Sequence, residues 1–283
     1  MAALSRFREV LSKGKVLRLG CHHVRRMSSL VSVEKQGKVA VLELNRKPVN
    51  SFSLEFLQEI NENLDQMEND QDCCGIMITS GLPKVFSAGL DLVKEVYKPS
   101  SEKQLSTFWQ AFQEMWLRVY GSRLLTVAAI NGHALAGGCV LSLACDYRIM
   151  AEGPTIGLVE TEAGVPPPFW VFNNLAAVVG KGAAEKAILS SKRYTAKEAL
   201  AIGMVDKVVP KEKLIDEAKS QLNELTVFSG RTMQLTKMVM RKDDVEALEN
   251  RREEDIKEFV DSIMDEEVQK AIGLQVEKLH KKT

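Results

Sequence analysis

The chain has 283 residues, with 38 basic and 38 acidic side chains and a formal net charge of zero. Its hydrophobic content of 45% is enough for a large core, so we expect one sizeable domain, with or without an appendage. The balanced charge gives no sign of a nucleic-acid surface, and no apolar run reaches the roughly eighteen residues that span a bilayer, so we expect neither a nucleic-acid partner nor an integral membrane segment. The five cysteines form no CxxC pair and no Cys/His cluster, which favours free thiols and no metal site.

The first thirty residues differ in composition from the rest of the chain. They hold seven Lys or Arg side chains against a single acid, Glu9, and their apolar residues recur at roughly helical spacing. This basic, amphipathic, acid-poor pattern is typical of a mitochondrial transit peptide with a cleavage site near Met27-Ser28. An ordinary basic terminus is the alternative. We expect residues 1–30 to be removed and the mature protein to reside in the mitochondrial matrix.

From residue 31 to about residue 200, predicted strands and helices alternate. In chain order, they are two short strands within 31–45 joined at Gln36-Gly37, a helix over 53–70, a strand over 73–80, a helix over 101–121, a strand over 124–130, a helix from the Gly137-Gly138 pair and a strand over 147–151. Such alternation predicts an α/β fold with a mostly parallel sheet covered by helices.

Beyond about residue 195, strand signals nearly vanish apart from 204–209. The remaining segments, 211–225, 231–240 and 244–264, predict helices that are charged on one face. We expect the methionines of 231–240 to pack in the core. These helices would pack on the α/β core or on a neighbouring subunit. We therefore divide the mature chain into a core over 31–200 and a C-terminal helical region over 201–283 that serves packing and oligomerisation.

Two turns carry small residues where a strand gives way to a helix. They are "VFSAGLDL" (85–92) and "NGHALAGGCVLSL" (131–143). The first amides of a helix have no internal partner and the helix dipole makes that end electropositive, while small residues let a ligand oxygen approach closely. If both turns face one crevice, the amides of Ala88 and Gly137 form two convergent donors for an oxygen that becomes anionic. The alternative is that the glycines only permit tight turns and close packing.

Four motifs extend this pattern: "FSAGLDL", "AAINGHALAGGCVLSLACDYRIMAE", "IGLVETEAGV" and "TAKEALAIGMVDKVV". Their order and separation resemble the crotonase (enoyl-CoA hydratase/isomerase) superfamily over about residues 33–262. The resemblance implies a crotonase-like spiral of ββα units, acyl-CoA thioester substrates, no metal or organic cofactor because coenzyme A is part of the substrate, and a homotrimer. It also implies an oxyanion hole at the amides of Ala88 and Gly137. The acyl thioester and pantetheine path would be lined by Ala88, Gly89, Leu90, Asp91, Leu92, Gly137 and Val159.

The number of carboxylates separates activities within this superfamily. The hydratases resembled here have one glutamate three residues after the oxyanion-hole glycine and another in the later motif, whereas this chain has Val140 and Glu160 at those positions. One carboxylate cannot easily orient a water molecule and also supply a second proton, but it can move a proton between two carbons. The resemblance therefore implies an isomerase that converts 3-enoyl-CoA, cis or trans, to trans-2-enoyl-CoA in β-oxidation of unsaturated fatty acids, with Glu160 as the catalytic residue. Apolar walls should raise the pKa of Glu160, and the walls we expect are Val140, Val159, Phe169 and Trp170.

Other activities remain open. A hydratase, a dienoyl-CoA isomerase or a thioester hydrolase typically needs a further acid, and Val140 and Pro168 stand where the dienoyl isomerase has aspartates. A catalytically silent acyl-CoA-binding protein is an alternative of a different class, because a fold alone does not fix a function.

Several further residues have a simpler structural interpretation. We expect Glu162 to be solvated or ion-paired, and Asp91 to be a helix-start charge rather than an acid catalyst. His133, without a carboxylate to orient it, is expected to be a packed or loop residue. Asp146 and Arg148 are expected to make structural contacts.

An aromatic set at helical spacing is expected to be core, with one edge able to line an acyl tunnel: Phe108, Trp109, Phe112 and Trp116. For the methionines of 231–240, the alternative to core packing is that they cover the acyl chain of this subunit or the next.

Overall fold

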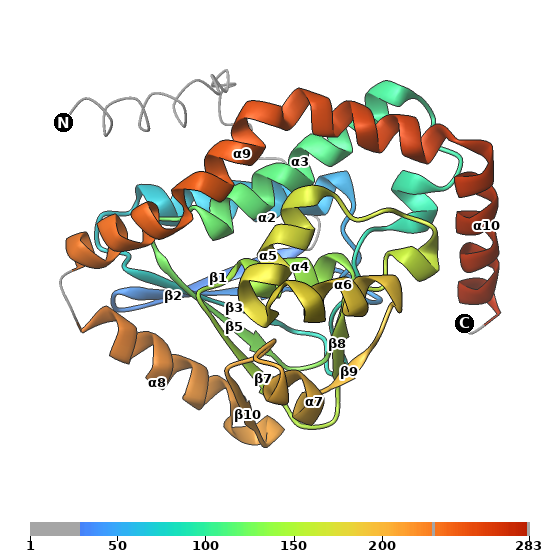
Figure 1. The fold of residues 1–283 in the computed structure, drawn as a ribbon. Helices are drawn as coiled ribbons and strands as arrows, with labels where there is room; N and C mark the ends of the chain where they lie inside the picture. The colour runs from blue at the N-terminus through green and yellow to red at the C-terminus, as the bar shows by residue number, and fades with distance from the viewer. Residues whose placement is uncertain (1–28, 228–229, 282–283) are drawn as a thin grey trace.

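The computed structural model describes residues 29–227 and 230–281 (Figure 1). The predicted transit peptide lies outside the described residues except for its last two positions, and Cys21 lies outside them as well. The described cysteines, Cys73, Cys74, Cys139 and Cys145, are all free thiols, as predicted. None of the described helices is both long and apolar enough to cross a bilayer.

The larger of two sheets has six strands in the order β1-β2-β3-β5-β7-β10. The hairpin β1-β2 forms at the predicted turn, where Gly37 has a φ of 63° that favours glycine. The other neighbouring pairs in this sheet are parallel, which confirms the predicted mostly parallel sheet. The strands are β1 (Val31–Gln36), β2 (Val39–Leu44), β3 (Gly75–Ser80), β5 (Leu125–Ile130), β7 (Tyr147–Ala151) and β10 (Lys207–Val209).

A second sheet of four very short strands was not predicted. Its order is β4-β6-β8-β9, and only the β8-β9 pair among these described strands is antiparallel. Strands of two or three residues are too short to give a recognisable alternation of apolar and polar side chains. These strands are β4 (Val85–Ser87), β6 (His133–Leu135), β8 (Thr155–Gly157) and β9 (Tyr194–Thr195).

The chain passes repeatedly from the larger sheet to the smaller sheet and then into a helix. β3 and β4 are followed by α3 (Glu102–Tyr120), β5 and β6 by α4 (Gly137–Ala144), and β7 and β8 by α5 (Phe169–Val179). This repeated ββα unit confirms the predicted spiral. Because β4, β6 and β8 pair side by side, each unit brings its second loop to the same end of the smaller sheet.

Helices on one face of the larger sheet enclose the main core. α2 (Leu54–Asn69) begins after Ser53, whose hydroxyl accepts a hydrogen bond from the Phe56 amide at 3.3 Å, and α3 begins in the same way after Ser101. Figure 1 shows α9 (Gly230–Met264) crossing over α3 on this side of the molecule. The core between them holds Trp116 and Trp170 among its largest fully buried side chains.

On the opposite face, α8 (Leu214–Thr226) covers the larger sheet. Leu214, Ala218 and Leu222 recur along one side of α8 and pack on Met77 and Val127 of the sheet. β10, from the C-terminal region, completes this sheet beside β7. The division at residue 200 stays a prediction.

The segments predicted as helices over 231–240 and 244–264 are helical, but the expected core packing of the methionines holds only in part. Residues 231–240 and 244–264 belong to a single 35-residue helix, α9, since the intervening residues include neither Gly nor Pro. Met240 is 76% exposed and does not pack in the core, whereas Met233 is partly buried beneath the larger sheet. The remaining helices are α6 (Lys181–Leu189), α7 (Ala196–Ala201), α10 (Glu266–His280) and the short η1 (Leu92–Val96), η2 (Thr161–Ala163) and η3 (Lys211–Lys213).

Candidate functional site

A narrow cavity lies where the loops after β4, β6 and β8 meet. Its walls are almost wholly apolar, and Glu160 is the one ionisable side chain among its lining residues. The lining residues are Leu90, Trp109, Phe112, Gly137, Val140, Glu160, Val165, Pro166, Pro167, Pro168 and Val171.

The two glycine-bearing turns lie against each other at this cavity. A Cβ atom on Gly89 would come within 2.8 Å of the Gly137 amide nitrogen, and a Cβ on Gly137 would come within 3.2 Å of the Gly89 Cα. Gly89 also has a φ of 92°, a conformation that other residues rarely adopt. The structure therefore brings together two turns that are almost fifty residues apart in the sequence, and both glycines are needed for their close approach.

Hydrogen bonding decides which amides of these turns are available. The Ala88 amide donates to the Val49 carbonyl at 3.0 Å, so it cannot serve as the expected oxyanion donor without losing that bond. The next two residues pair with Phe52: the Phe52 amide donates to the Gly89 carbonyl at 2.7 Å and the Asp91 amide donates to the Phe52 carbonyl at 2.9 Å. In such a parallel bridge the amide of the middle residue, Leu90, points away from Phe52.

Two amides beside the cavity are left without an acceptor. Among the described residues, neither the Leu90 amide nor the Gly137 amide donates a hydrogen bond, and both residues line the cavity. Gly137 is the first residue of α4, where the helix supplies no acceptor and its dipole favours a negative ligand. The expectation for Ala88 is corrected to Leu90, because the sequence motif does not reveal that Ala88 is held by Val49. Ala88 is exposed and does not line the cavity.

The residue before Gly137 has an unusual backbone conformation. Ala136 has φ 49° and ψ −124°, in a region that glycine occupies far more readily than alanine. Its amide donates to the Gly157 carbonyl at 2.9 Å, and its carbonyl accepts from the Val140 amide at 3.0 Å. The conformation of Ala136 turns the chain from β6 into α4 and so sets the direction of the Gly137 amide.

Glu160 also lines the cavity and lies between β8 and the short helix η2. The residue is only 9% exposed, and its Oε2 atom has no hydrogen-bond partner in the part of the chain that the structure describes. Burial raises the pKa of Glu160 to about 7, because the charged form loses its hydration and no cation replaces it. The backbone of Glu160 is held more firmly than its side chain, since the Glu160 carbonyl accepts hydrogen bonds from the amides of Ala163 and Val165 at 2.9 and 3.0 Å.

The walls around Glu160 differ in part from those expected. Val140 lines the cavity as predicted. Val159 is buried but does not line it, Trp170 lies behind the aromatic wall, and Phe169 lies 4.9 Å beneath the Arg251 guanidinium.

Several wall residues were missed or only partly foreseen. The Val165–Pro168 segment and Val171 were not expected, although the proline cluster is visible in the sequence. Trp109 and Phe112 fulfil the expectation that one edge of the aromatic set lines the cavity, while Phe108 and Trp116 are core residues.

Asp91 and Glu162 behave as predicted, whereas His133 is neither packed nor in a loop but exposed at the start of β6. Asp91 pairs with Arg46 at 2.6 Å and accepts from the Lys94 amide at the start of η1, so its carboxylate is engaged away from the reaction site. Leu92 begins that helix. Glu162 pairs with Arg193 at 2.6 Å, and the Nδ1 atom of His133, which lies in β6, accepts from the Thr155 amide at 3.1 Å.

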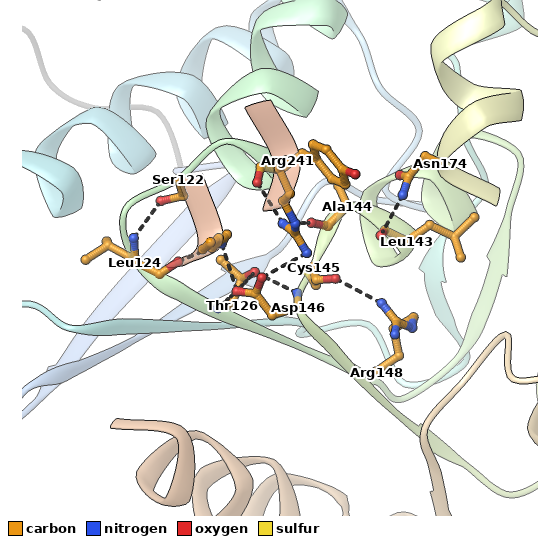
Figure 2. A network of polar contacts seen from close by, with 12 residues as sticks. Ser122, Leu124, Thr126, Leu143, Ala144, Cys145, Asp146, Arg148, Asn174 and Arg241 are labelled. Atoms are coloured by element: carbon orange, nitrogen blue, oxygen red, sulfur yellow. Dashed lines mark hydrogen bonds and ion pairs between the residues drawn. The ribbon is translucent and has the colours of Figure 1, made fainter. Parts of the chain in front are cut away.

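A second buried carboxylate, Asp146, is fully paired (Figure 2). It lies 2.8 Å from the Lys237 ammonium and 2.9 Å from the Arg241 guanidinium, both on α9, and accepts from the Thr126 amide at 2.7 Å. Burial by itself would raise the pKa of Asp146, but the two cations and the hydrogen bonds outweigh burial and lower that pKa. Arg148 pairs with Asp206 at 2.7 Å, so both residues make the predicted structural contacts. Within the described residues, no three His, Cys, Asp or Glu side chains cluster as metal ligands would.

The fold and this site define a member of a known class of enzymes. A profile of the enoyl-CoA hydratase/isomerase family matches residues 34–282, and the chain belongs to that family. Rat mitochondrial enoyl-CoA delta isomerase 1 is 41% identical over 256 residues, which cover 89% of this chain and 88% of the relative. The crystal structure of human mitochondrial delta3-delta2-enoyl-CoA isomerase matches with a TM-score of 0.88 and 41% identity, over 90% of this chain and 99% of that one. A short-chain-enoyl-CoA hydratase of Clostridium acetobutylicum is 32% identical over 215 residues, covering 75% of this chain and 81% of the relative.

Proposed function

We propose that this chain is a Δ3,Δ2-enoyl-CoA isomerase, which converts cis or trans 3-enoyl-CoA to trans-2-enoyl-CoA in β-oxidation of unsaturated fatty acids. One observation carries the proposal. Among the described residues, the cavity is lined by a single carboxylate, Glu160, and by two residues whose amides have no acceptor, and the remaining lining is apolar. This arrangement suits the removal and return of one proton beside a carbonyl group.

In the proposed reaction, the thioester oxygen accepts hydrogen bonds from the Leu90 and Gly137 amides. Glu160 in its ionised form removes a proton from C2 of the 3-enoyl group, and the electrons of that C–H bond pass into a dienolate whose oxygen carries the negative charge. The two amides stabilise this charge. Protonated Glu160 then delivers the proton to C4, the double bond moves to C2–C3, and the enzyme returns to its starting state.

The electrostatics of Glu160 suit both halves of this cycle. A carboxylate with a pKa of about 7 is a stronger base than an exposed glutamate, and it still exists in ionised form at the slightly alkaline pH of a mitochondrial matrix. The apolar walls also exclude water that would compete for the proton or add to the double bond.

Hydratase activity is the second candidate, because the similar proteins include a hydratase. The position three residues after Gly137 is Val140, which is apolar and lines the cavity. Within the described part of the chain, no other acid lines the cavity to orient an attacking water molecule. This lining favours isomerisation over hydration.

The test compares two neighbouring glutamates. Glu160→Gln should lower kcat for 3-hexenoyl-CoA isomerisation by about 10²–10⁴-fold, the usual contribution of a general base, while calorimetry still detects hexanoyl-CoA binding. Glu162→Gln is the matched control, since Glu162 is exposed and paired with Arg193, and its kcat should stay near that of the wild type. Substantial isomerisation by the Glu160 variant, or rapid hydration of 2-hexenoyl-CoA by the wild type, would contradict the proposal.

The remaining features of the protein are part of the same proposal. Residues 1–30 would direct the chain to the mitochondrial matrix, which is supported by their composition and by the mitochondrial names of the similar isomerases. The enzyme would need no cofactor besides the coenzyme A of its substrate and would act as a homotrimer. Val239 and Met240 on α9 are 78% and 76% exposed and offer apolar surface to a neighbouring subunit. N-terminal sequencing of the mature protein and light scattering would test these points.

A further inference from the structure

Asp255 on α9 is a buried carboxylate that the proposed reaction does not use. It is 2% exposed, and its Oδ2 atom accepts hydrogen bonds from Trp109 Nε1 at 2.7 Å, Gln113 Nε2 at 2.6 Å and Trp170 Nε1 at 3.3 Å. No Lys, Arg or His side chain in the described ranges forms an ion pair with Asp255. The carboxylate is thus held by neutral N–H groups, two of which belong to indole rings.

Such an arrangement fixes the rings. A buried carboxylate is costly unless its oxygens accept hydrogen bonds, and hydrogen bonds to an ionised group are stronger than those between neutral groups. Any rotation of Trp109 or Trp170 away from Asp255 would break one of these bonds. Asp255 therefore restrains two indoles that come from different helices, Trp109 from α3 and Trp170 from α5.

Trp109 is restrained on a second side as well. Its ring stacks on Phe259 with centroids 3.8 Å apart and an angle of 6° between the planes. Phe259 is one turn beyond Asp255 on α9, so a single face of that helix holds both the edge and the face of the indole. Trp109 also lines the cavity, together with Phe112 at a centroid distance of 5.3 Å.

The cavity therefore has a firmly held wall at Trp109. Beyond this ring lie Phe259 and Asp255, and Trp170 packs against both Trp109 and Phe112 at 6.1 and 5.8 Å. A longer acyl chain entering from the side of Glu160 and Gly137 would have to displace an indole that is both stacked and hydrogen-bonded.

We propose that Trp109 forms the end wall of the acyl cavity and limits the length of the acyl chain, and that Asp255 is a positioning residue that holds this wall in place. This inference rests on the proposed acyl-CoA substrate. It assigns control of the acyl-chain length to α9 as well as to the residues that line the cavity.

The test is the ratio of kcat/KM for 3-dodecenoyl-CoA to that for 3-hexenoyl-CoA. Trp109→Ala should raise this ratio about tenfold or more, since each methylene group accepted by an apolar pocket changes kcat/KM by a large factor. Trp109→Phe, a smaller change that preserves folding, should raise it less. Asp255→Ala should raise the ratio by releasing the indole, whereas Asp255→Asn, which keeps an oxygen acceptor, should give a ratio close to that of the wild type.

Trp116→Phe is the matched control. Trp116 lies on the same helix, is equally buried and donates to Asn174 at 3.1 Å, but it does not line the cavity. Its ratio should equal that of the wild type. A folded Trp109 variant with an unchanged ratio, or an equal change in the Trp116 variant, would contradict the proposal that Trp109 forms the end wall. A changed ratio for Trp109→Ala with no change for Asp255→Ala would contradict the positioning role of Asp255.

Binding measurements separate this inference from the proposed reaction. Calorimetry gives the ratio of the Kd values for dodecanoyl-CoA and hexanoyl-CoA, which require no turnover. A wild-type protein that binds these thioesters but does not isomerise 3-hexenoyl-CoA would contradict the proposed function, while the binding ratio of the Trp109 variants would still support or overturn the wall. Failure to bind either thioester would overturn both.

Discussion

Two buried carboxylates in this protein have opposite surroundings. Asp146 lies among two cations and the backbone of β5, and all of these groups face it directly (Figure 2). Glu160 lies in an apolar cavity, with one oxygen lacking any partner among the described residues. Burial acts in the same direction on both groups, yet the pKa of Asp146 is lowered and the pKa of Glu160 is raised to about 7.

The same contrast extends to the backbone around each group. Near Asp146, the Arg241 guanidinium also satisfies the carbonyls of Tyr120 and Ala144, so the region joins α9 to the end of α3 and to α4. Near Glu160, the Leu90 and Gly137 amides have no acceptor in the described chain, and Ala136 adopts a conformation that costs free energy. The cavity thus combines an unpaired carboxylate, two amides without an acceptor and a strained residue, whereas Asp146 is held by charges and hydrogen bonds. Polar groups that lack partners within the protein are available to bind and react with a substrate.

The largest expected effect comes from removing the charge of the paired carboxylate. Asp146→Asn would leave Lys237 buried beside Arg241 without its counter-ion, and we expect the free energy of unfolding to fall by about 3–5 kcal/mol. Asp261→Asn is the control, because Asp261 and its partner Lys257 are both exposed and the loss should be about 1 kcal/mol or less. Urea denaturation measures both values. Equal losses of unfolding free energy in the two variants would show that Asp146 and its partners contribute no more to stability than an exposed ion pair.

The corresponding substitution at the unpaired carboxylate, Glu160→Gln, should raise the free energy of unfolding rather than lower it. The pKa of Glu160 is higher in the folded state than in the unfolded state, so between about pH 4.5 and pH 7 the folded protein binds more protons and the wild type loses stability as the pH rises. Glu160→Gln removes this titration. The free energy of unfolding of the variant, relative to that of the wild type, should therefore rise by roughly 2–4 kcal/mol between pH 4.5 and a pH above 7. Denaturant titrations of both proteins across this pH range measure the difference. A constant difference at all pH values would mean that Glu160 is not buried and unpaired.

The smallest effect concerns the strained backbone. Ala136→Gly should raise the free energy of unfolding by about 1 kcal/mol, because glycine adopts the observed conformation without strain. The same variant should lower kcat, since a more flexible residue orients the Gly137 amide less firmly. Ala134→Gly, at a buried position of the adjacent strand β6, should instead lower the stability. Destabilisation by both substitutions would show that the Ala136 methyl group contributes more by packing than its conformation costs.

Some of this structure follows directly from local sequence. The apolar spacing and the Ser53 cap predict α2 to within a residue, and the contrast between Val140 and Glu160 points to one carboxylate in the site. Local pattern cannot show which amides are already bonded, since the Ala88 amide is occupied by Val49, a residue from a different part of the fold. For this reason the sequence motif predicted the Ala88 amide as an oxyanion-hole donor, whereas in the structure the available amide is that of Leu90.

Other features depend on contacts between distant segments. The strands β6, β8 and β9 are stabilised by pairing with one another rather than by any internal pattern. Asp255 appears in the sequence as one acid in a highly charged helix, and its burial depends on Trp109 and Trp170, which lie 146 and 85 residues away. A sequence reading that treats each helix separately cannot find such a residue.

The unbroken course of α9 ties the paired carboxylate region to the aromatic wall. Lys237 and Asp255 are eighteen residues apart on this helix, which is about five full turns at 3.6 residues per turn, so both side chains face the body of the protein. Deleting or inserting one residue between them would rotate one contact by about 100° relative to the other. The number of residues between Lys237 and Asp255 therefore fixes the direction of one side chain relative to the other. Both can keep their partners only if the helix between them changes in length by about whole turns.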